Sequence, residues 1–285
     1  MGFWPNSEES THHRSEDFRN CYQRVQSSIR TLFNLSEEEW DVLLIPMNGS
    51  LAIESVIRTF GGKVKVKTEG AFSQRVAAVH HHSEAPWSFG VLHETNDSRL
   101  CDVSECDIVD AVSALPYFDF PRQAKVVITV SSKQLGAATI WSLVMVRREF
   151  WAQANALKGY LDLQRYRDFA IFFETPCTPP ISALFSLEQK LADFDLLSFR
   201  RRVDDRYRRL SEWILSMGGE VKGGPPGLTF RLPESLKLEA DRFWLPPGGE
   251  GWMQAFLWSG SDSEVDQLMA DLTTVWNFCS EKETG

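Results

Sequence analysis

Two residues with complementary chemistry follow short apolar runs in the middle of the chain. Asp110 closes the run I-V-D, and Lys133 lies in a small polar turn just after Val126–Val130. These runs, and a third at 143–146, are rich in β-branched residues, which predicts strands buried on both faces, as in a parallel α/β sheet. Ligands bind at the carboxyl ends of such strands. There Lys133 can form an imine with an aldehyde and Asp110 can pair with a protonated ring nitrogen, the arrangement used with pyridoxal phosphate.

Each of the two residues also has a simpler interpretation. A lysine in a turn is most often a solvated surface residue, and an aspartate after a strand often caps the next helix. Taken alone, each residue favours the simpler interpretation. Taken as a pair, and together with the further segments described next, they favour a cofactor site.

Two segments contain this pair: D-A-V-S at 110–113 and S-S-K-Q-L-G at 131–136. They resemble the class V, fold type I aminotransferases, nearest in motif to the 2-aminoethylphosphonate–pyruvate and alanine–glyoxylate members. The resemblance covers roughly residues 10–215. It implies that Asp110 holds the pyridine nitrogen and that Lys133 is the Schiff-base lysine. It also places Ser113 and Ser132 in the site of pyridoxal 5'-phosphate.

A turn near the N-terminus predicts the phosphate position. Asn48-Gly49-Ser50 lies between a strand predicted at Trp40–Ile45 and a helix predicted at 51–60. Free backbone N–H groups and the helix dipole make such a turn an anion site, although most such turns only connect two elements. The resemblance implies that the cofactor phosphate binds at this triplet.

Three further segments resemble the same family. E-G-A-F-S-Q-R at 69–75 resembles a turn whose aromatic residue lies on the pyridine ring, which implies that Phe72 stacks there. H-E-T at 93–95 implies that the Thr95 hydroxyl bonds the ring oxygen. T-P-P at 178–180 implies that Thr178 reaches the phosphate of the other subunit, so a homodimer is expected. Without the resemblance, Phe72 would be taken as a core aromatic and Thr95 as an ordinary turn residue.

Two short intervals and one substitution depart from the family pattern. The intervals between Arg75 and His93 and between Thr95 and Asp107 are too short for the usual peripheral elements, so a shortened form of the fold is expected. Gln254 stands where the family has an arginine that grips the substrate carboxylate. Arg231 or Arg242 takes over that role, or the substrate is not held by an α-carboxylate.

Composition sets outer limits. The chain has 285 residues, 43% of them hydrophobic, and a formal net charge of −9. A chain of this length can form one large domain, or a large and a small one. Together with the resemblance, we expect an N-terminal arm and helix at 1–34, a large α/β cofactor-binding domain at 35–215 with a mainly parallel sheet and flanking helices, and a small α+β domain at 216–285. The negative charge argues against nucleic acid, and no apolar run reaches the roughly 20 residues of a membrane span.

The cysteines, the histidines and the N-terminus limit the function further. Five cysteines without CxxC spacing and an N-terminus unlike a signal peptide predict a reduced, cytoplasmic protein. The adjacent His80, His81 and His82 cannot point together, so no metal site is expected.

The expected activity is that of a pyridoxal-phosphate-dependent aminotransferase in a biosynthetic pathway. It would move an amino group between a small amine or amino acid and an oxo compound, with Lys133 as the general base. For that role the pKa of Lys133 must fall below its free value, which burial and a nearby positive ring would cause. Two alternatives stay open: another reaction on the same cofactor, such as that of a lyase, cyclase or decarboxylase, and a non-catalytic dimeric relic of the fold.

Overall fold

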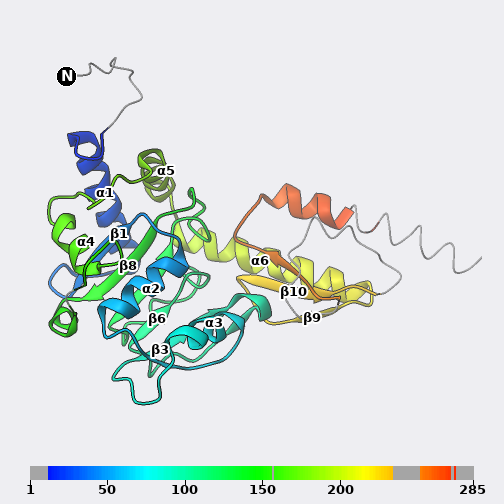
Figure 1. The fold of residues 1–285 in the computed structure, drawn as a ribbon. Coiled ribbons are helices and arrows are strands. Elements are labelled where there is room, and N and C mark those ends of the chain that lie inside the picture. Colours follow the sequence, from blue (N-terminus) through cyan, green and yellow to red (C-terminus); the bar gives the residue numbers. More distant parts are fainter. Residues whose placement is uncertain (1–11, 156, 234–250, 271–272, 274–285) are drawn as a thin grey trace, which may run out of the picture.

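A six-stranded sheet forms the centre of the larger part of the molecule (Figure 1). The computed structural model describes residues 12–155, 157–233, 251–270 and 273. The strand order is β1-β8-β7-β6-β3-β2. The strands are β1 (Trp40–Ile45), β2 (Lys65–Val66), β3 (Ser88–Val91), β6 (Ile108–Asp110), β7 (Val126–Val130) and β8 (Ser142–Arg147).

Strand directions confirm a mainly parallel sheet with one reversed strand. β2, β3, β6 and β7 pair in parallel, whereas β8 is antiparallel to both of its neighbours, β7 and β1. The run at 143–146 is fully buried, as predicted, but it does not run parallel to its neighbours. Residues 131–141, which include Lys133 and form no helix, connect β7 to β8, and a connection without a crossover helix favours antiparallel neighbours.

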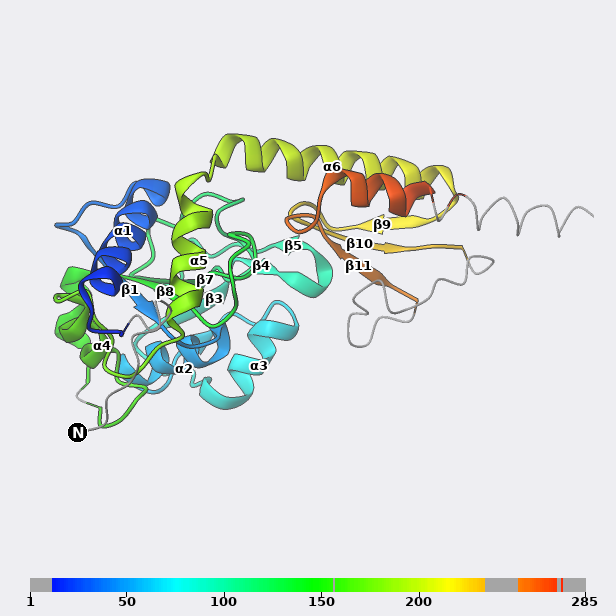
Figure 2. The ribbon, with the colours of Figure 1, turned by 90° about the horizontal axis from the view of Figure 1, so that it is seen from above.

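Helices cover both faces of the sheet (Figure 2). α1 (Glu16–Phe33) and α5 (Ile181–Ala192) lie side by side on one side, and α2 (Gly49–Thr59) and α3 (Ala71–His80) lie on the other. α4 (Leu163–Ala170) contacts β1 and α2. α1 begins where the Ser15 hydroxyl accepts a hydrogen bond from Phe18 N, and its apolar face is buried.

A second, smaller sheet packs on a long helix. α6 (Leu196–Ser216) runs from α5 to a three-stranded antiparallel sheet made of β9 (Glu220–Lys222), β10 (Gly227–Arg231) and β11 (Met253–Phe256). A helix at 262–270 follows. The buried face of α6 meets apolar residues of β10 in a separate core that includes Phe199, Val203, Leu210, Ile214, Leu228 and Phe230.

The connections between β3 and β6 are short. The small hairpin of β4 (His93–Glu94) and β5 (Arg99–Leu100) and the 3-10 turn η1 (Thr95–Asp97) are the only elements between them, and no helix intervenes. The shortened form expected for this interval is therefore present. No helix in the described residues has the length and apolar character to cross a membrane.

One local prediction was wrong: the segment 69–75, predicted as a turn, contains the start of α3. A 3-10 segment, η2 (Arg148–Gln153), follows β8. The small domain expected at 216–285 is described at 216–233, 251–270 and 273, and the rest of it lies outside the described residues.

Candidate active site

The predicted cofactor residues gather at one edge of the large sheet. Asn48, His93 and Lys133 follow β1, β3 and β7, and Asp110 ends β6. β1, β3, β6 and β7 all run in the same direction, so these residues share the carboxyl edge of the sheet. At Gly49 an added Cβ would lie 3.1 Å from Val112 Cγ2, which shows how closely the β1–α2 turn approaches the end of β6.

Lys133 is half-buried beside an aromatic ring. Its Nζ lies 5.6 Å from the centre of the Phe72 ring. Burial lowers the pKa of the Lys133 amine, and the negative charge of Asp110 opposes that shift without cancelling it. The amine is therefore neutral more often than an exposed lysine at the same pH.

Asp110 is a buried carboxylate, and few neighbouring groups stabilise its negative charge. It is 6% exposed, and its Oδ1 accepts one hydrogen bond, from Val112 N at 2.9 Å. Burial raises its pKa to about 6, although the hydrogen bond from Val112 and the charge of Lys133 act in the opposite direction. Among the described residues it has no ion-pair partner, so a ligand that brings a positive charge would stabilise its ionised form.

Glu94 fixes the backbone around Phe72. Its carboxylate is completely buried and accepts hydrogen bonds from Phe72 N (3.2 Å), Ser73 N (3.1 Å) and the Ser73 hydroxyl (2.7 Å). These N–H groups belong to the first turn of α3, where a negative charge also complements the helix dipole. Gly70 leaves room for the carboxylate, since an added Cβ there would lie 2.6 Å from Glu94 Cδ. The segment 69–75 is therefore held by a residue that lies far along the chain.

Thr95, Ser113 and His93 form a buried hydrogen-bonded cluster. The Thr95 hydroxyl donates to Ser113 Oγ at 2.8 Å, and His93 Nδ1 lies 3.0 Å from the same oxygen. Ser113 Oγ in turn donates to the His93 carbonyl at 3.0 Å. Thr95 and Ser113 thus lie together beside the end of β6.

The turn before α2 leaves donors free. Asn48 Oδ1 accepts a hydrogen bond from Leu51 N at 3.0 Å, which caps the helix. The backbone N–H groups of Gly49 and Ser50 have no acceptor within the described part of the chain. Free N–H groups at a helix start favour a phosphate. Ser132 is half-buried directly before Lys133.

The structure does not bring Thr178 to the other site residues of the same chain. Thr178 is exposed in the segment before α5. A bond from Trp141 Nε1 to the Pro180 carbonyl (3.3 Å) holds this segment against the connection between Lys133 and β8.

Gln254 has a different position from that expected of a residue that grips a substrate. It is 2% exposed, and its Nε2 donates to the Thr95 carbonyl and to Ser98 Oγ (3.2 Å). Of the two arginines considered as replacements, Arg231 forms an ion pair with Glu220, and Arg242 lies outside the described residues. Gln254 therefore links the small sheet to the cofactor edge of the large one.

Sequence reasoning gave no site role to three residues that organise this edge. They are His93, Glu94 and Gln134. The Gln134 Nε2 donates to the Ser113 carbonyl at 2.6 Å, and the Gln134 Oε1 accepts from Tyr117 N at 2.8 Å. The available signal was their position: two belong to the H-E-T segment and the third follows Lys133.

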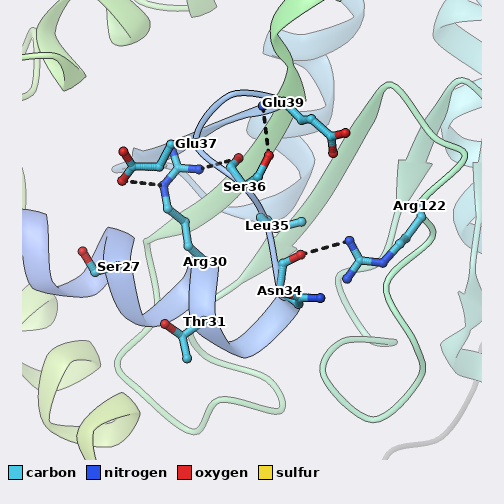
Figure 3. Close-up of a pocket in the computed structure, with 9 residues that line it drawn as sticks. All are labelled: Ser27, Arg30, Thr31, Asn34, Leu35, Ser36, Glu37, Glu39 and Arg122. Atoms are coloured by element: carbon cyan, nitrogen blue, oxygen red, sulfur yellow. Dashed lines mark hydrogen bonds and ion pairs between the residues drawn. The ribbon is translucent and has the colours of Figure 1, made fainter.

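A large hollow lies at the opposite edge of the sheet (Figure 3). It has a volume of about 810 Å³, and its lining residues precede β1 and β7 rather than follow them. Arg30 bonds the Ser36 carbonyl and Glu37, and Arg122 bonds the Asn34 carbonyl. These contacts close the connection from α1 to β1, so the polar groups of the hollow serve the fold.

The three adjacent histidines diverge. His80 pairs with Glu54, whereas His81 Nδ1 accepts from Val66 N and His82 Nδ1 accepts from Glu84 N. The described residues contain no cluster of three or more histidine, cysteine or acidic side chains suited to a metal ion.

Comparison with known proteins identifies the fold. No family model and no curated protein matches the sequence. Among solved structures, the chain is similar to a subgroup IV aspartate aminotransferase from Thermus thermophilus, with a TM-score of 0.81 and 16% identity over 95% of this chain and 93% of that one. A phosphoserine aminotransferase from Bacillus circulans subsp. alkalophilus has a TM-score of 0.80 and 15% identity over 94% and 89%. An alanine–glyoxylate aminotransferase from Nostoc sp. has a TM-score of 0.78 and 15% identity over 93% and 89%. The fold is fold type I, that of the class V-like aminotransferases.

Proposed function

We propose that the protein is a pyridoxal-phosphate-dependent aminotransferase that moves an amino group between a small amine or amino acid and an oxo compound. One observation carries the proposal. A half-buried lysine and a buried carboxylate lie at neighbouring strand ends, with an aromatic ring beside the lysine, and the carboxylate has no ion-pair partner among the described residues. The likeness in fold to several aminotransferases supports it.

The residues at the sheet edge fit pyridoxal phosphate. Asp110 would face the protonated ring nitrogen and gain the positive partner that it lacks. The free N–H groups at Gly49 and Ser50, in the turn capped by Asn48, would hold the phosphate. Phe72 would lie on the ring, and Thr95, Ser113 and Ser132 would contribute hydroxyl groups. When bound, the cofactor supplies an aldehyde that takes up amines and a ring that accepts electrons.

Lys133 would have two roles. Its Nζ would hold the cofactor covalently and, once displaced by the substrate amine, would take a proton from the substrate carbon and return it at a later step. The lowered pKa of Lys133 increases the neutral fraction of Nζ that such a base requires. The buried Asp110 would stay ionised beside the ring nitrogen throughout.

We further propose a homodimer in the cytoplasm, with the cofactor-binding domain at 35–215. Thr178 is exposed in the single chain. A residue that contacts the cofactor phosphate of a partner subunit has to be exposed in this way. Ile171 and Phe172, in the same segment, are 70% and 66% exposed. Large apolar side chains left in water a few residues before this threonine support an interface that includes this segment. Sedimentation of the purified protein tests the dimer, and sedimentation as a monomer would contradict it.

Gln254 favours a second candidate, a different reaction on the same cofactor. A neutral residue bonded to the Thr95 carbonyl offers no charge for a substrate carboxylate. A lyase, cyclase or decarboxylase that holds its substrate in another way would suit this site. The amine that reacts, and whether an oxo product forms, separate this candidate from transamination.

The visible absorption spectrum of the purified protein with added pyridoxal phosphate tests the proposal. Native protein should show a band that borohydride abolishes, and Lys133→Ala should not. The exposed Lys190→Ala serves as the matched control and should keep the band. Loss of the band with amines, together with formation of an oxo product, would support transamination. If the native protein shows no band at saturating cofactor, the assignment as a pyridoxal-phosphate enzyme is refuted, and the alternative of a non-catalytic relic of the fold remains.

A further inference from the structure

The amine of Lys133 lies over the ring of Phe72. Its Nζ is 5.6 Å from the ring centre, within the distance at which the face of an aromatic ring attracts an ammonium. Lys133 is half-buried, so this charge has lost part of its water. Among the described residues, Nζ forms no hydrogen bond and no ion pair. The ring therefore replaces part of the lost hydration.

The position of the Phe72 ring is set from its own backbone. Glu94 accepts a hydrogen bond from Phe72 N at 3.2 Å, and it also accepts from the backbone and the hydroxyl of Ser73. These bonds hold the first turn of α3, which carries the ring. Phe72 thus offers a fixed aromatic surface to the group that lies at this edge of the sheet.

The backbone of Lys133 is held as firmly. Its carbonyl accepts a hydrogen bond from Gly136 N at 3.1 Å, and the next residue, Gln134, donates to the Ser113 carbonyl at 2.6 Å. The flexible part of Lys133 is its four-carbon side chain. The contact with Phe72 therefore determines where the amine at the end of this chain lies.

Two titratable groups act on Lys133 without binding its amine. Burial lowers the pKa of Lys133, and the negative charge of Asp110 raises it, but the two side chains form no ion pair. Burial, and secondly the charge of Lys133, lower the pKa of His93 to about 3, so that ring is neutral. The buried Nε2 of His93 has no hydrogen-bond partner among the described residues. The amine contacts the ring of Phe72 and neither of these groups.

The remaining charges belong to α3 and to the residue that caps it. Glu94 is occupied by the N–H groups of Phe72 and Ser73. The exposed Arg75 guanidinium lies over the Phe72 ring, 5.0 Å from its centre. One ring thus attracts two cations, of which only that of Lys133 is half-buried.

We propose that Phe72 is a positioning residue for Lys133: its ring binds the Lys133 ammonium whenever the lysine is not joined to the cofactor. The contact would hold the free amine at the carboxyl edge of the sheet instead of letting it turn into solvent. It is a property of the cofactor-free protein and does not need the chain to be an enzyme.

The proposed function gives this contact a consequence. There the Phe72 ring lies on the pyridine ring, which would compete with the ammonium for the same aromatic face. A lysine released by a substrate amine would then lack the partner that favours its charged form, so its pKa would be lower than in the cofactor-free protein. This part rests on the proposed function, since a general base must be neutral.

Fluorine separates the electrons of the ring from its shape. Analogues of phenylalanine with one, two or three ring fluorines, placed at position 72, withdraw electron density from the ring face in steps. The ring changes little in size across the series. An attraction between ammonium and ring weakens in the same order, because it depends on the negative charge of the face. Apolar packing follows no such order.

The measurement is the titration of Lys133 in the cofactor-free full-length chain. The rate of trace acetylation is followed against pH and read by mass spectrometry of peptides, with the exposed Lys190 as internal reference. The pKa of Lys133 should fall with each fluorine, by about half a unit to one unit over the series. The same analogues at the exposed Phe172 are the matched control and should leave Lys133 unchanged.

Phe72→Leu tests the opposite explanation, that the side chain only excludes water. Loss of the aromatic face should lower the pKa of Lys133, whereas entry of water past a smaller side chain would raise it. A rise in Phe72→Leu would overturn the proposal. Equal titration of Lys133 across the fluorinated series would overturn it as well.

A second readout reports the position of the amine without titration. In protein that contains carbon-13 lysine, the ring current of Phe72 should shift the ε-methylene protons of Lys133 upfield. The shift should vanish in Phe72→Leu. An ordinary chemical shift for these protons in the wild-type protein would refute the contact.

The outcome stays separate from that of the proposed function. A fluorine-dependent Lys133 titration together with no cofactor band would leave the contact standing and refute the enzyme. A cofactor band together with a titration that ignores the fluorines would do the reverse.

Discussion

Glu94 and Ser73 lie on different elements and are joined by a 2.7 Å hydrogen bond from the Ser73 hydroxyl to Glu94 Oε1. The same carboxylate accepts the backbone N–H groups of Phe72 and Ser73. One buried acid next to Thr95 thus determines where α3 begins and where the Phe72 ring lies.

Replacing this acid should destabilise the protein. Glu94→Ala removes three hydrogen bonds and leaves the part-buried Phe72 N–H and the buried Ser73 N–H without their acceptor, so we expect a loss of about 1–3 kcal/mol in the free energy of unfolding. Denaturant unfolding measures the change. Glu84→Ala, at an exposed glutamate, is the control and should stay within about 0.5 kcal/mol of wild type. Equal effects of the two substitutions would contradict the role of Glu94.

Asp110 should make the stability of the cofactor-free protein depend on pH. Burial raises its pKa from 3.8 to about 6, so the folded chain holds this proton more tightly than the unfolded chain. The stability that protonation contributes is complete below pH 3.8 and is lost as pH rises through about 6, a loss of about 3 kcal/mol.

Asp110→Asn tests this dependence. The variant should be more stable than cofactor-free wild type at pH 8, and the difference should shrink towards pH 4. Unfolding curves at several pH values check it, with the exposed Asp193→Asn as control. A pH-independent difference would show that Asp110 is not the group that titrates.

Two adjacent glycines should respond differently to the same substitution. At Gly223 an added Cβ would lie 2.4 Å from the Asp97 and Ser98 carbonyl oxygens, and φ is +76°, whereas at Gly224 nothing lies within 4 Å. Gly223→Ala should cost about 2 kcal/mol or more, because the contact between η1 and the small sheet must open. Gly224→Ala should change thermal stability little. Equal melting temperatures for the two variants would argue against a tight contact here.

A charge at Gln254 should weaken the link between the small sheet and Thr95. In the wild-type protein the Thr95 carbonyl accepts a hydrogen bond from Gln254 Nε2. Gln254→Glu places a carboxylate against this carbonyl instead. We expect a loss of about 1–3 kcal/mol at pH 8 and partial recovery at pH 5, where a protonated carboxyl can donate again. Urea unfolding at the two pH values measures this, and the neutral Gln254→Met should show no such recovery.

Elements with a strong local pattern were predicted well from sequence. β1 and β7 match the expected segments closely, because short runs of apolar and β-branched residues are local signals. The direction of β8 had no such signal. A strand buried on both faces has the same composition whether its neighbours are parallel or antiparallel, and only the pairing decides.

The start of α3 shows why other features escaped prediction. Its segment contains Gly70 and lacks a side-chain cap of its own, so a turn was the natural interpretation. The helix begins there because the cap comes from Glu94, which a local pattern cannot reveal. The predicted cofactor residues do share one edge of the sheet, apart from Thr178, and their roles stay predictions. The orphan nitrogen of His93 appears only when the partners of each atom are counted.

The strand order has a consequence for the newly made chain. Among the described strands, β1 pairs only with β8, which follows it by about a hundred residues. At roughly 5–20 residues per second, a ribosome needs on the order of 5–20 s to deliver that partner. During this time the apolar run Trp40–Ile45 has no strand partner, and the backbone edge that later pairs with β8 is exposed to other chains. Early association with α1, whose Gln26 and Tyr22 side chains bond the backbone of β1, is the protection that the emerging chain carries with it.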